Sequence, residues 1–77
     1  MGKGEVIFSD HALKQLSERQ ISKEWVKFTI ASPTKLIVRE ERFEAYRRFR
    51  KLYLKVIFVR VEGKVIIVTQ HLVKKLP

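Results

Sequence analysis

The stretch from Leu52 to Val73, LYLKVIFVRVEGKVIIVTQHLV, constrains the fold more than any other part of the sequence. It contains two runs rich in Val, Ile, Phe and Tyr, the residue types that suit the pleated surface of a sheet. Glu62-Gly63 separates the two runs, and a glycine supplies the positive φ that tight hairpin turns require. The stretch therefore predicts a long β-hairpin.

The length of the turn decides which side chains of this hairpin share a face. If residues 61–63 form a three-residue loop, Lys55 and His71 lie on the same face. If Glu62-Gly63 alone forms the loop, the two side chains lie on opposite faces, because successive side chains of a strand alternate. We favour the three-residue loop, since glutamate adopts a positive φ less readily than Asn or Asp.

Two helices are predicted before the hairpin. Ser9 is an N-cap candidate for a helix from Asp10 to about Arg19, in which apolar side chains recur at helical spacing. Ser22 is the N-cap candidate for a second helix with a broad apolar side. This helix ends at residues 31–33, because the residue before a proline is steered away from helical angles.

The remaining segments predict short strands. After a frayed end at residues 1–4, Val6 to Phe8 reads as an edge strand, and Lys35 to Arg39 and Phe43 to Arg50 read as two more, joined by a turn at residues 40–42. The sequence thus predicts a single α+β domain over residues 1–77. Both N-terminal helices are expected to pack on one face of a curved antiparallel sheet of three to five strands.

The charge of the chain points to an anionic partner. The 17 Lys and Arg residues outnumber the 8 Asp and Glu residues and give a net charge of +9, and such a field attracts nucleic acid or acidic proteins. No apolar run is long enough to cross a bilayer and no signal peptide is recognisable, so a cytoplasmic protein without membrane contact is expected. The absence of Cys removes thiolate chemistry, and we expect neither a metal nor a cofactor.

Basic and aromatic residues interleave before and within the first hairpin strand. Cations that neutralise phosphates and rings on which bases stack are typical of single-stranded RNA binding. The alternative is a solvated edge strand, whose charges prevent edge-to-edge pairing with other chains. The residues concerned are Tyr46, Arg47, Arg48, Arg50, Lys51 and Tyr53.

Both faces of the predicted strand Leu52 to Val61 are largely apolar, so two helices alone leave an apolar surface uncovered. Exposed contiguous apolar surface usually marks an interaction site, which favours a protein partner or a homodimer through this face. The alternative is a central strand shielded by the long side chains of its neighbours.

The hairpin LKVIFVRVEGKVIIVTQHL resembles the central hairpin of the RelE/ParE-type toxin superfamily. Its members carry a basic residue before Val-Ile-Tyr or Val-Ile-Phe, then a turn, then a Val/Ile-rich strand ending near a His or Arg. The opening SDHALKQLSERQIS is similar to a subgroup of small uncharacterised proteins that begin the first helix with His-Ala, place an Arg near its end and continue with Ile-Ser.

This resemblance implies a RelE-like fold and a toxin–antitoxin function, in which ribonucleolytic members cleave mRNA without a metal. The ribose 2′-OH attacks the adjacent phosphate, which requires a base, an acid and cations. By the resemblance, the catalytic candidates are His71, Lys55, Arg48 and Arg50. RNA contact falls to Arg47, Lys51, Tyr46 and Tyr53, and the partners implied are RNA and an acidic antitoxin-like protein.

Two observations favour a different function. Many active members carry a further Tyr or His beyond the last strand, and this sequence has neither after Val73. A single His on a strand is also more often structural than catalytic. The alternative is a non-catalytic toxin-like module that binds a protein target or nucleic acid through its basic sheet face. His11 is expected to be solvated, and Arg19 is not interpreted as catalytic.

Overall fold

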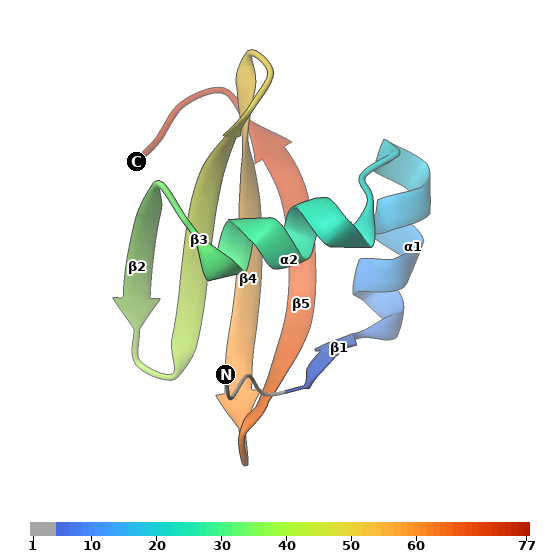
Figure 1. The fold of residues 1–77 in the computed structure, drawn as a ribbon, viewed down its shortest axis with the longest axis vertical. Helices are drawn as coiled ribbons and strands as arrows, with labels where there is room; N and C mark the ends of the chain where they lie inside the picture. The colour runs from blue at the N-terminus through green and yellow to red at the C-terminus, as the bar shows by residue number, and fades with distance from the viewer. Residues whose placement is uncertain (1–4) are drawn as a thin grey trace.

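Strands β4 (Leu52–Val61) and β5 (Lys64–Val73) form the predicted long hairpin, and β4 is the central strand of the sheet (Figure 1). The structure is a computed structural model that describes residues 5–77. The predicted frayed end, residues 1–4, lies outside the described residues. The strand bounds follow the sequence closely, because the β-branched and aromatic runs begin and end at the two turns.

The turn of the hairpin contains two residues, since Val61 pairs with Lys64. Glu62 and Gly63 have φ angles of 49° and 79°. Positive φ at both positions is typical of type I′ turns, whose twist matches that of the flanking strands. The predicted three-residue loop is therefore wrong. The match in twist outweighs the cost of a positive φ at Glu62.

Three further strands complete a mixed five-stranded sheet in the order β1-β5-β4-β3-β2. β1 (Val6–Phe8) is the predicted edge strand, but it pairs in parallel with β5, whereas an antiparallel sheet is predicted. β2 (Lys35–Arg39) and β3 (Arg42–Phe49) are antiparallel to their neighbours. Arg50, predicted as the last residue of β3, instead lies with Lys51 in a two-residue turn and has a φ of 60°.

Both predicted helices are present and begin at the predicted caps. In α1 (Asp10–Arg19) the Ser9 Oγ accepts a hydrogen bond from the third residue of the helix at 3.0 Å. In α2 (Lys23–Ala31) the Ser22 Oγ accepts the equivalent bond at 3.2 Å. Each serine thereby satisfies one of the unpaired N–H groups of a first turn. Neither helix is long and apolar enough to cross a membrane.

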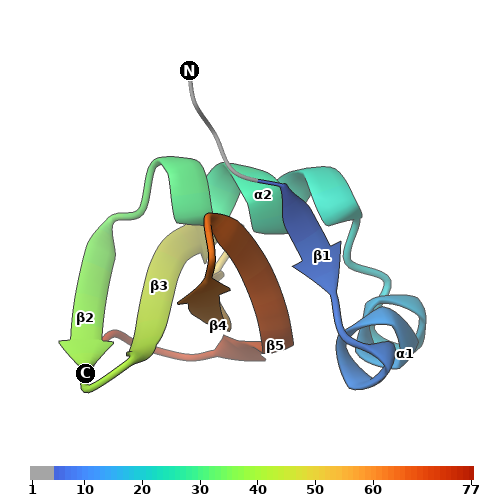
Figure 2. The same cartoon turned by 90° about the horizontal axis from the view of Figure 1, so that it is seen from below.

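The two helices occupy different positions around the sheet, so the predicted packing of both on one face is not confirmed. α2 crosses one face, over β3 and β4, whereas α1 lies beside the edge formed by β5 (Figures 1 and 2). β1 pairs with residues 65–67 of β5. Beyond them α1 and its N-cap cover the edge. The Ser9 hydroxyl donates to the Val68 carbonyl at 3.1 Å, and the backbone N–H of Gln70 donates to the Gln15 Oε1 at 3.3 Å. Polar groups of an edge strand are thus paired by a helix.

The core lies between the sheet and the two helices. Apolar side chains at alternate positions of β4 point into it, as the period of two of a strand requires. Buried Gln70 also faces this side, and its Nε2 donates to the Ala12 carbonyl at 2.8 Å, which ties α1 to β5. The buried apolar residues of the core are Ala12, Leu16, Ile21, Val26, Ala45, Leu54, Val56, Phe58 and Ile67.

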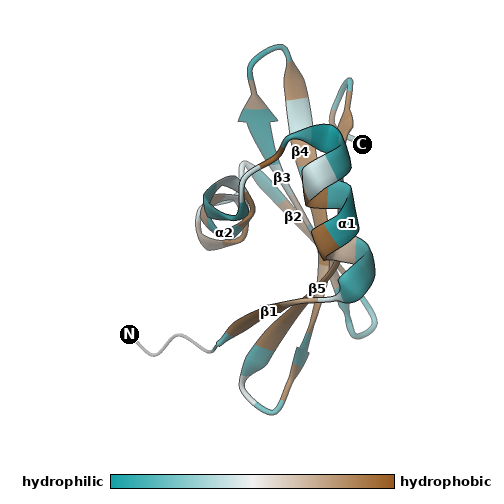
Figure 3. Ribbon diagram, turned by 90° about the vertical axis from the view of Figure 1, so that its right-hand side faces the viewer, coloured by the Kyte–Doolittle hydropathy of each residue, from teal (hydrophilic) through white to brown (hydrophobic). Residues whose placement is uncertain are grey.

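We call the sheet face away from α2 the outer face; on β4 it carries Tyr53, Lys55, Ile57 and Val59. The C-terminal residues 74–77 form neither a helix nor a strand, as predicted, and lie on this side of the sheet (Figure 3). They reach β2, where the Lys35 Nζ donates to the Pro77 carbonyl at 3.2 Å. Part of the outer face is therefore already covered by the chain itself.

Candidate active site on the outer face

A β-bulge sets the register of the part of the hairpin that lies farther from the turn. Phe58 pairs with Ile67, but the preceding residue, Ile57, pairs with Thr69. Val68 is therefore the additional residue that a bulge inserts into one strand of an antiparallel pair. Beyond the bulge every pairing is shifted by one residue relative to the turn. The shift turns the following side chains of β5 to the opposite face from the one that the two-residue loop alone would give them.

As a consequence, Lys55 and His71 are direct cross-strand partners on the outer face. The predicted shared face is confirmed, although the loop on which that prediction was based is wrong. Directly opposite side chains of an antiparallel pair have their Cβ atoms roughly 4.5–5.5 Å apart, so both can contact one ligand. The pair is the geometric centre of the candidate site.

The pair belongs to a row that crosses four strands. Lys35 pairs with Tyr46, Tyr46 with Lys55, and Lys55 with His71. The Lys55 Nζ lies 5.7 Å from the centroid of the Tyr46 ring, within the range of a cation–π interaction. The Tyr46 hydroxyl donates to Glu44 at 3.3 Å. Tyr46 is only 3% exposed, so it supports Lys55 and offers no open ring face for the predicted stacking of a base.

The electrostatic environment keeps the imidazole of His71 neutral. Partial burial lowers the pKa of His71 below its ordinary value of 6.5, and the positive charges of Lys55 and Arg19 lower this pKa further. Burial and like charges both disfavour the imidazolium form. At pH 7 the ring therefore has a nitrogen free to accept a proton, which is the state required of a general base.

Arg19 is a functional candidate that sequence reasoning missed. It is an exposed residue of the last turn of α1, which packs along the edge of β5, and its positive charge acts on His71. The sequence signals the helix and its end, but only the placement of the helix beside β5 reveals the neighbour. His11, at the other end of α1, is exposed as expected.

Consecutive arginines of β3 point to opposite faces. Arg48 is exposed on the outer face opposite Tyr53, and its guanidinium carbon lies 5.5 Å from the centroid of the Tyr53 ring. Arg47 lies on the other face, where it donates to the Ser32 carbonyl at 2.6 Å and covers the ring of Phe28 at 4.3 Å. Arg48 and Tyr53 thus neighbour the Lys55–His71 row, whereas Arg47 fastens α2 to the sheet.

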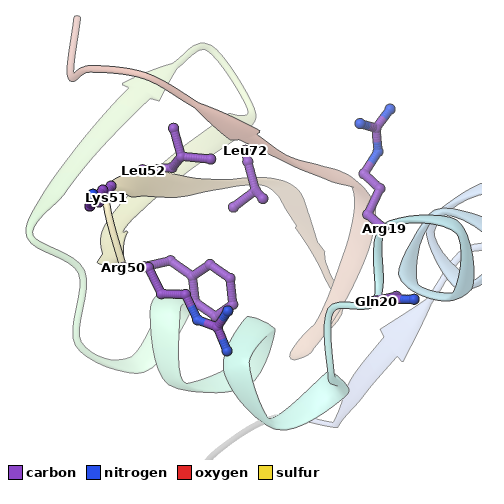
Figure 4. A pocket seen from close by; sticks show the side chains of 7 residues that line it. Arg19, Gln20, Arg50, Lys51, Leu52 and Leu72 are labelled. Carbon is purple, nitrogen blue, oxygen red and sulfur yellow. The ribbon is translucent and has the colours of Figure 1, made fainter.

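The remaining two predicted residues, Arg50 and Lys51, lie in the turn between β3 and β4. Together with Arg19 they line a groove of about 510 Å³ on the α2 side of the sheet (Figure 4). The structure therefore pairs His71 with Lys55, with Arg48 and Tyr53 alongside, and the charge of Arg19 acts on His71 from the end of α1. It places Arg50 and Lys51 around the end of the sheet and Arg47 on its far side.

The model of one protein family, described as a domain of unknown function (DUF4258), matches residues 8–70. The matched segment contains Arg19, Arg48 and Lys55, and His71 is the residue that follows it. No curated protein and no solved structure matches the chain.

Proposed function

Since the chain belongs to the DUF4258 family, whose description names no activity, we propose a function from the outer face itself: a metal-independent endoribonuclease of RelE-like fold that acts on mRNA in the cytoplasm. One observation carries the proposal, the direct pairing of a half-buried Lys55 with a half-buried His71 on the outer face, beside the exposed Arg48. Neutral imidazole beside fixed cations is the combination that cleavage by the 2′-OH needs.

In the proposed reaction His71 accepts the proton of a ribose 2′-OH. The 2′-oxygen forms a bond to the adjacent phosphorus, the bond from phosphorus to the 5′-oxygen breaks, and the leaving 5′-oxygen takes a proton from water. The products are a 2′,3′-cyclic phosphate and a 5′-hydroxyl. Lys55 and Arg19 stabilise the additional negative charge of the phosphorane, and Arg48 binds a neighbouring phosphate.

The net charge of +9 supports RNA as the ligand, since phosphate neutralisation supplies most of the affinity of non-specific nucleic-acid binding. It equally supports an acidic antitoxin-like protein as the cognate partner. Such a protein would inhibit the enzyme by covering the same cations. A complex of this kind should therefore exclude RNA.

The test is incubation of the purified protein with end-labelled RNA in EDTA, with His71→Ala and Lys55→Ala as variants. General acid–base catalysis contributes roughly 10²–10⁴-fold, so the histidine variant should lose at least about a hundredfold in rate. Lys64→Ala is the matched control, because Lys64 lies on the same hairpin at its far end. Cleavage by both site variants at the wild-type rate would contradict the proposal.

The second candidate is a non-catalytic module that binds a protein target or nucleic acid. It is favoured by the apolar residues of the outer face near the hairpin turn, where Ile57, Val59 and Ile66 are half-buried and Val61 is 46% exposed. This surface also fits the predicted homodimer. The module predicts RNA binding that weakens with salt, or a stable complex with an acidic protein, without any cleavage.

A further inference from the structure

The groove at the end of the sheet joins an apolar floor to a basic rim. It lies between the end of α1 and the turn from β3 to β4, and the side chains of Leu52 and Leu72 line it together with the ring of Phe49 (Figure 4). The cations at its mouth come from two separate parts of the chain. They are Arg19 from α1, and Arg50 and Lys51 from the turn.

The groove and the candidate active site meet at the end of β5. Leu72 directly follows His71, so the two side chains point to opposite faces of the same strand. Arg19 belongs to both places, because it lines the groove and its charge acts on His71. In Figure 4 its side chain extends away from α2, toward the side of the sheet on which the outer face lies.

We propose that this groove holds the base of a nucleotide next to the phosphate bound at Lys55 and His71. The inference rests on the proposed function and assigns a second subsite to the same RNA. An RNA strand that passes around the edge of β5 places one phosphate on the outer face and the neighbouring base in the groove. Arg19 then lies between the two and contacts the backbone that joins them.

The chemistry of the lining fits a nucleotide. The guanidinium carbon of Arg50 lies 5.7 Å from the centroid of the Phe49 ring, so an aromatic ring and a guanidinium plane, the two surfaces on which RNA bases stack, are adjacent. Three cations complement the phosphates on either side of a base. The volume also lies within the range of roughly 300–1,000 Å³ that is usual for ligand sites.

The test uses an uncleavable ligand, a tetranucleotide with 2′-O-methyl groups, and the methyl NMR signals of Leu52 and Leu72. These signals should shift and saturate with the tetranucleotide. An abasic tetramer with the same phosphates should bind without shifting them. Methyl shifts of equal size with both ligands, or with neither, would overturn the base site.

Affinity supplies a second measurement. The double variant Arg50→Ala/Lys51→Ala should bind the tetranucleotide at least about fivefold more weakly, as expected for loss of stacking and phosphate contacts. The matched control Arg42→Ala/Lys64→Ala removes the same two charges at the opposite end of the sheet. An equal loss of affinity in both double variants would mean attraction by net charge alone and would overturn the inference.

The two proposals can fail separately. His71→Ala should abolish cleavage and retain the methyl shifts of Leu52 and Leu72. If wild-type protein shows these shifts but cleaves no RNA, the endoribonuclease proposal fails and the base site stands. If it cleaves RNA and the methyl signals do not respond to the tetranucleotide, the base site fails and the endoribonuclease proposal stands.

Discussion

Lys55 and His71 face each other across β4 and β5 because the one-residue shift in register at the bulge offsets the shift caused by the two-residue turn. The turn has one residue fewer than the three-residue loop that would place them on one face, and β5 has one additional residue, Val68, between the turn and His71. Either feature alone would turn His71 toward the core. The bulge occurs where the edge partner of β5 changes, since β1 ends its pairing at Ile67 and the Ser9 hydroxyl binds the Val68 carbonyl.

The first prediction concerns the pKa of His71, which we expect to lie below 6.5 in the folded protein. Because burial is its main cause and the charges of Lys55 and Arg19 add to it, Lys55→Ala and Arg19→Ala should each raise this pKa. An NMR titration of the imidazole signals measures the effect. Lys64→Ala should leave the titration of His71 unchanged. If Lys55→Ala also left it unchanged, the predicted effect of Lys55 on the pKa of His71 would be contradicted.

The lowered pKa also makes stability depend on pH. The folded chain binds a proton at His71 less readily than the unfolded chain, so protonation favours unfolding. His71 should therefore contribute no pH dependence above 6.5, and stability should fall as the pH decreases from 6.5 toward the folded-state pKa. Thermal unfolding at several pH values should show this loss in the wild type. If the stability of His71→Ala fell with decreasing pH as steeply as that of the wild type, His71 would be excluded as the cause of the loss.

The hairpin turn should respond in opposite directions to two substitutions. Glu62→Asn should stabilise the protein by about 0.5 kcal/mol, because Asn-Gly is the preferred pair for two consecutive positive φ angles. Gly63→Ala should destabilise it by about 1 kcal/mol. Among residues 5–77, no atom outside the neighbouring residues lies within 4 Å of the position that a Cβ would take at Gly63, so this cost is conformational. Denaturant unfolding gives both values, and two changes of the same sign would contradict the assigned turn.

Neighbouring arginines should separate stability from RNA binding. Arg47→Ala removes the hydrogen bond to Ser32 and the contact with Phe28, and should cost about 1 kcal/mol of stability. Arg48→Ala should change stability by less than about 0.5 kcal/mol. If Arg48 contacts one phosphate, its loss should lower the salt dependence of RNA binding by about 0.7 in the log–log slope. If Arg47→Ala instead weakened RNA binding and Arg48→Ala instead lowered stability, the assignment of Arg48 to the outer face and Arg47 to the α2 side would be wrong.

Local sequence signals predicted most of the elements. The serine caps located both helices, the alternation of apolar residues located β3, and the β-branched and aromatic runs located β4 and β5, because these signals depend on neighbours in the chain. The bulge at Val68 and the place of Arg19 depend instead on where α1 and β1 meet the edge of β5. Segments distant in the sequence determine both, so no local pattern revealed them. The prediction of the turn was wrong because it used only the φ preference of Glu62, whereas the twist of the two flanking strands favours a type I′ turn.

The pairing of β1 with β5 joins the first and the last strand of the described chain, which has a consequence for when the candidate site can form during synthesis. Among the described elements, Arg19 belongs to the first helix and His71 to the last strand, and β1 pairs with β5. A growing polypeptide therefore cannot assemble the candidate site until its final strand has left the ribosome. If the protein cleaves mRNA as proposed, a nascent chain cannot cut the message that encodes it before β5 has been synthesised and has paired with β1 and β4.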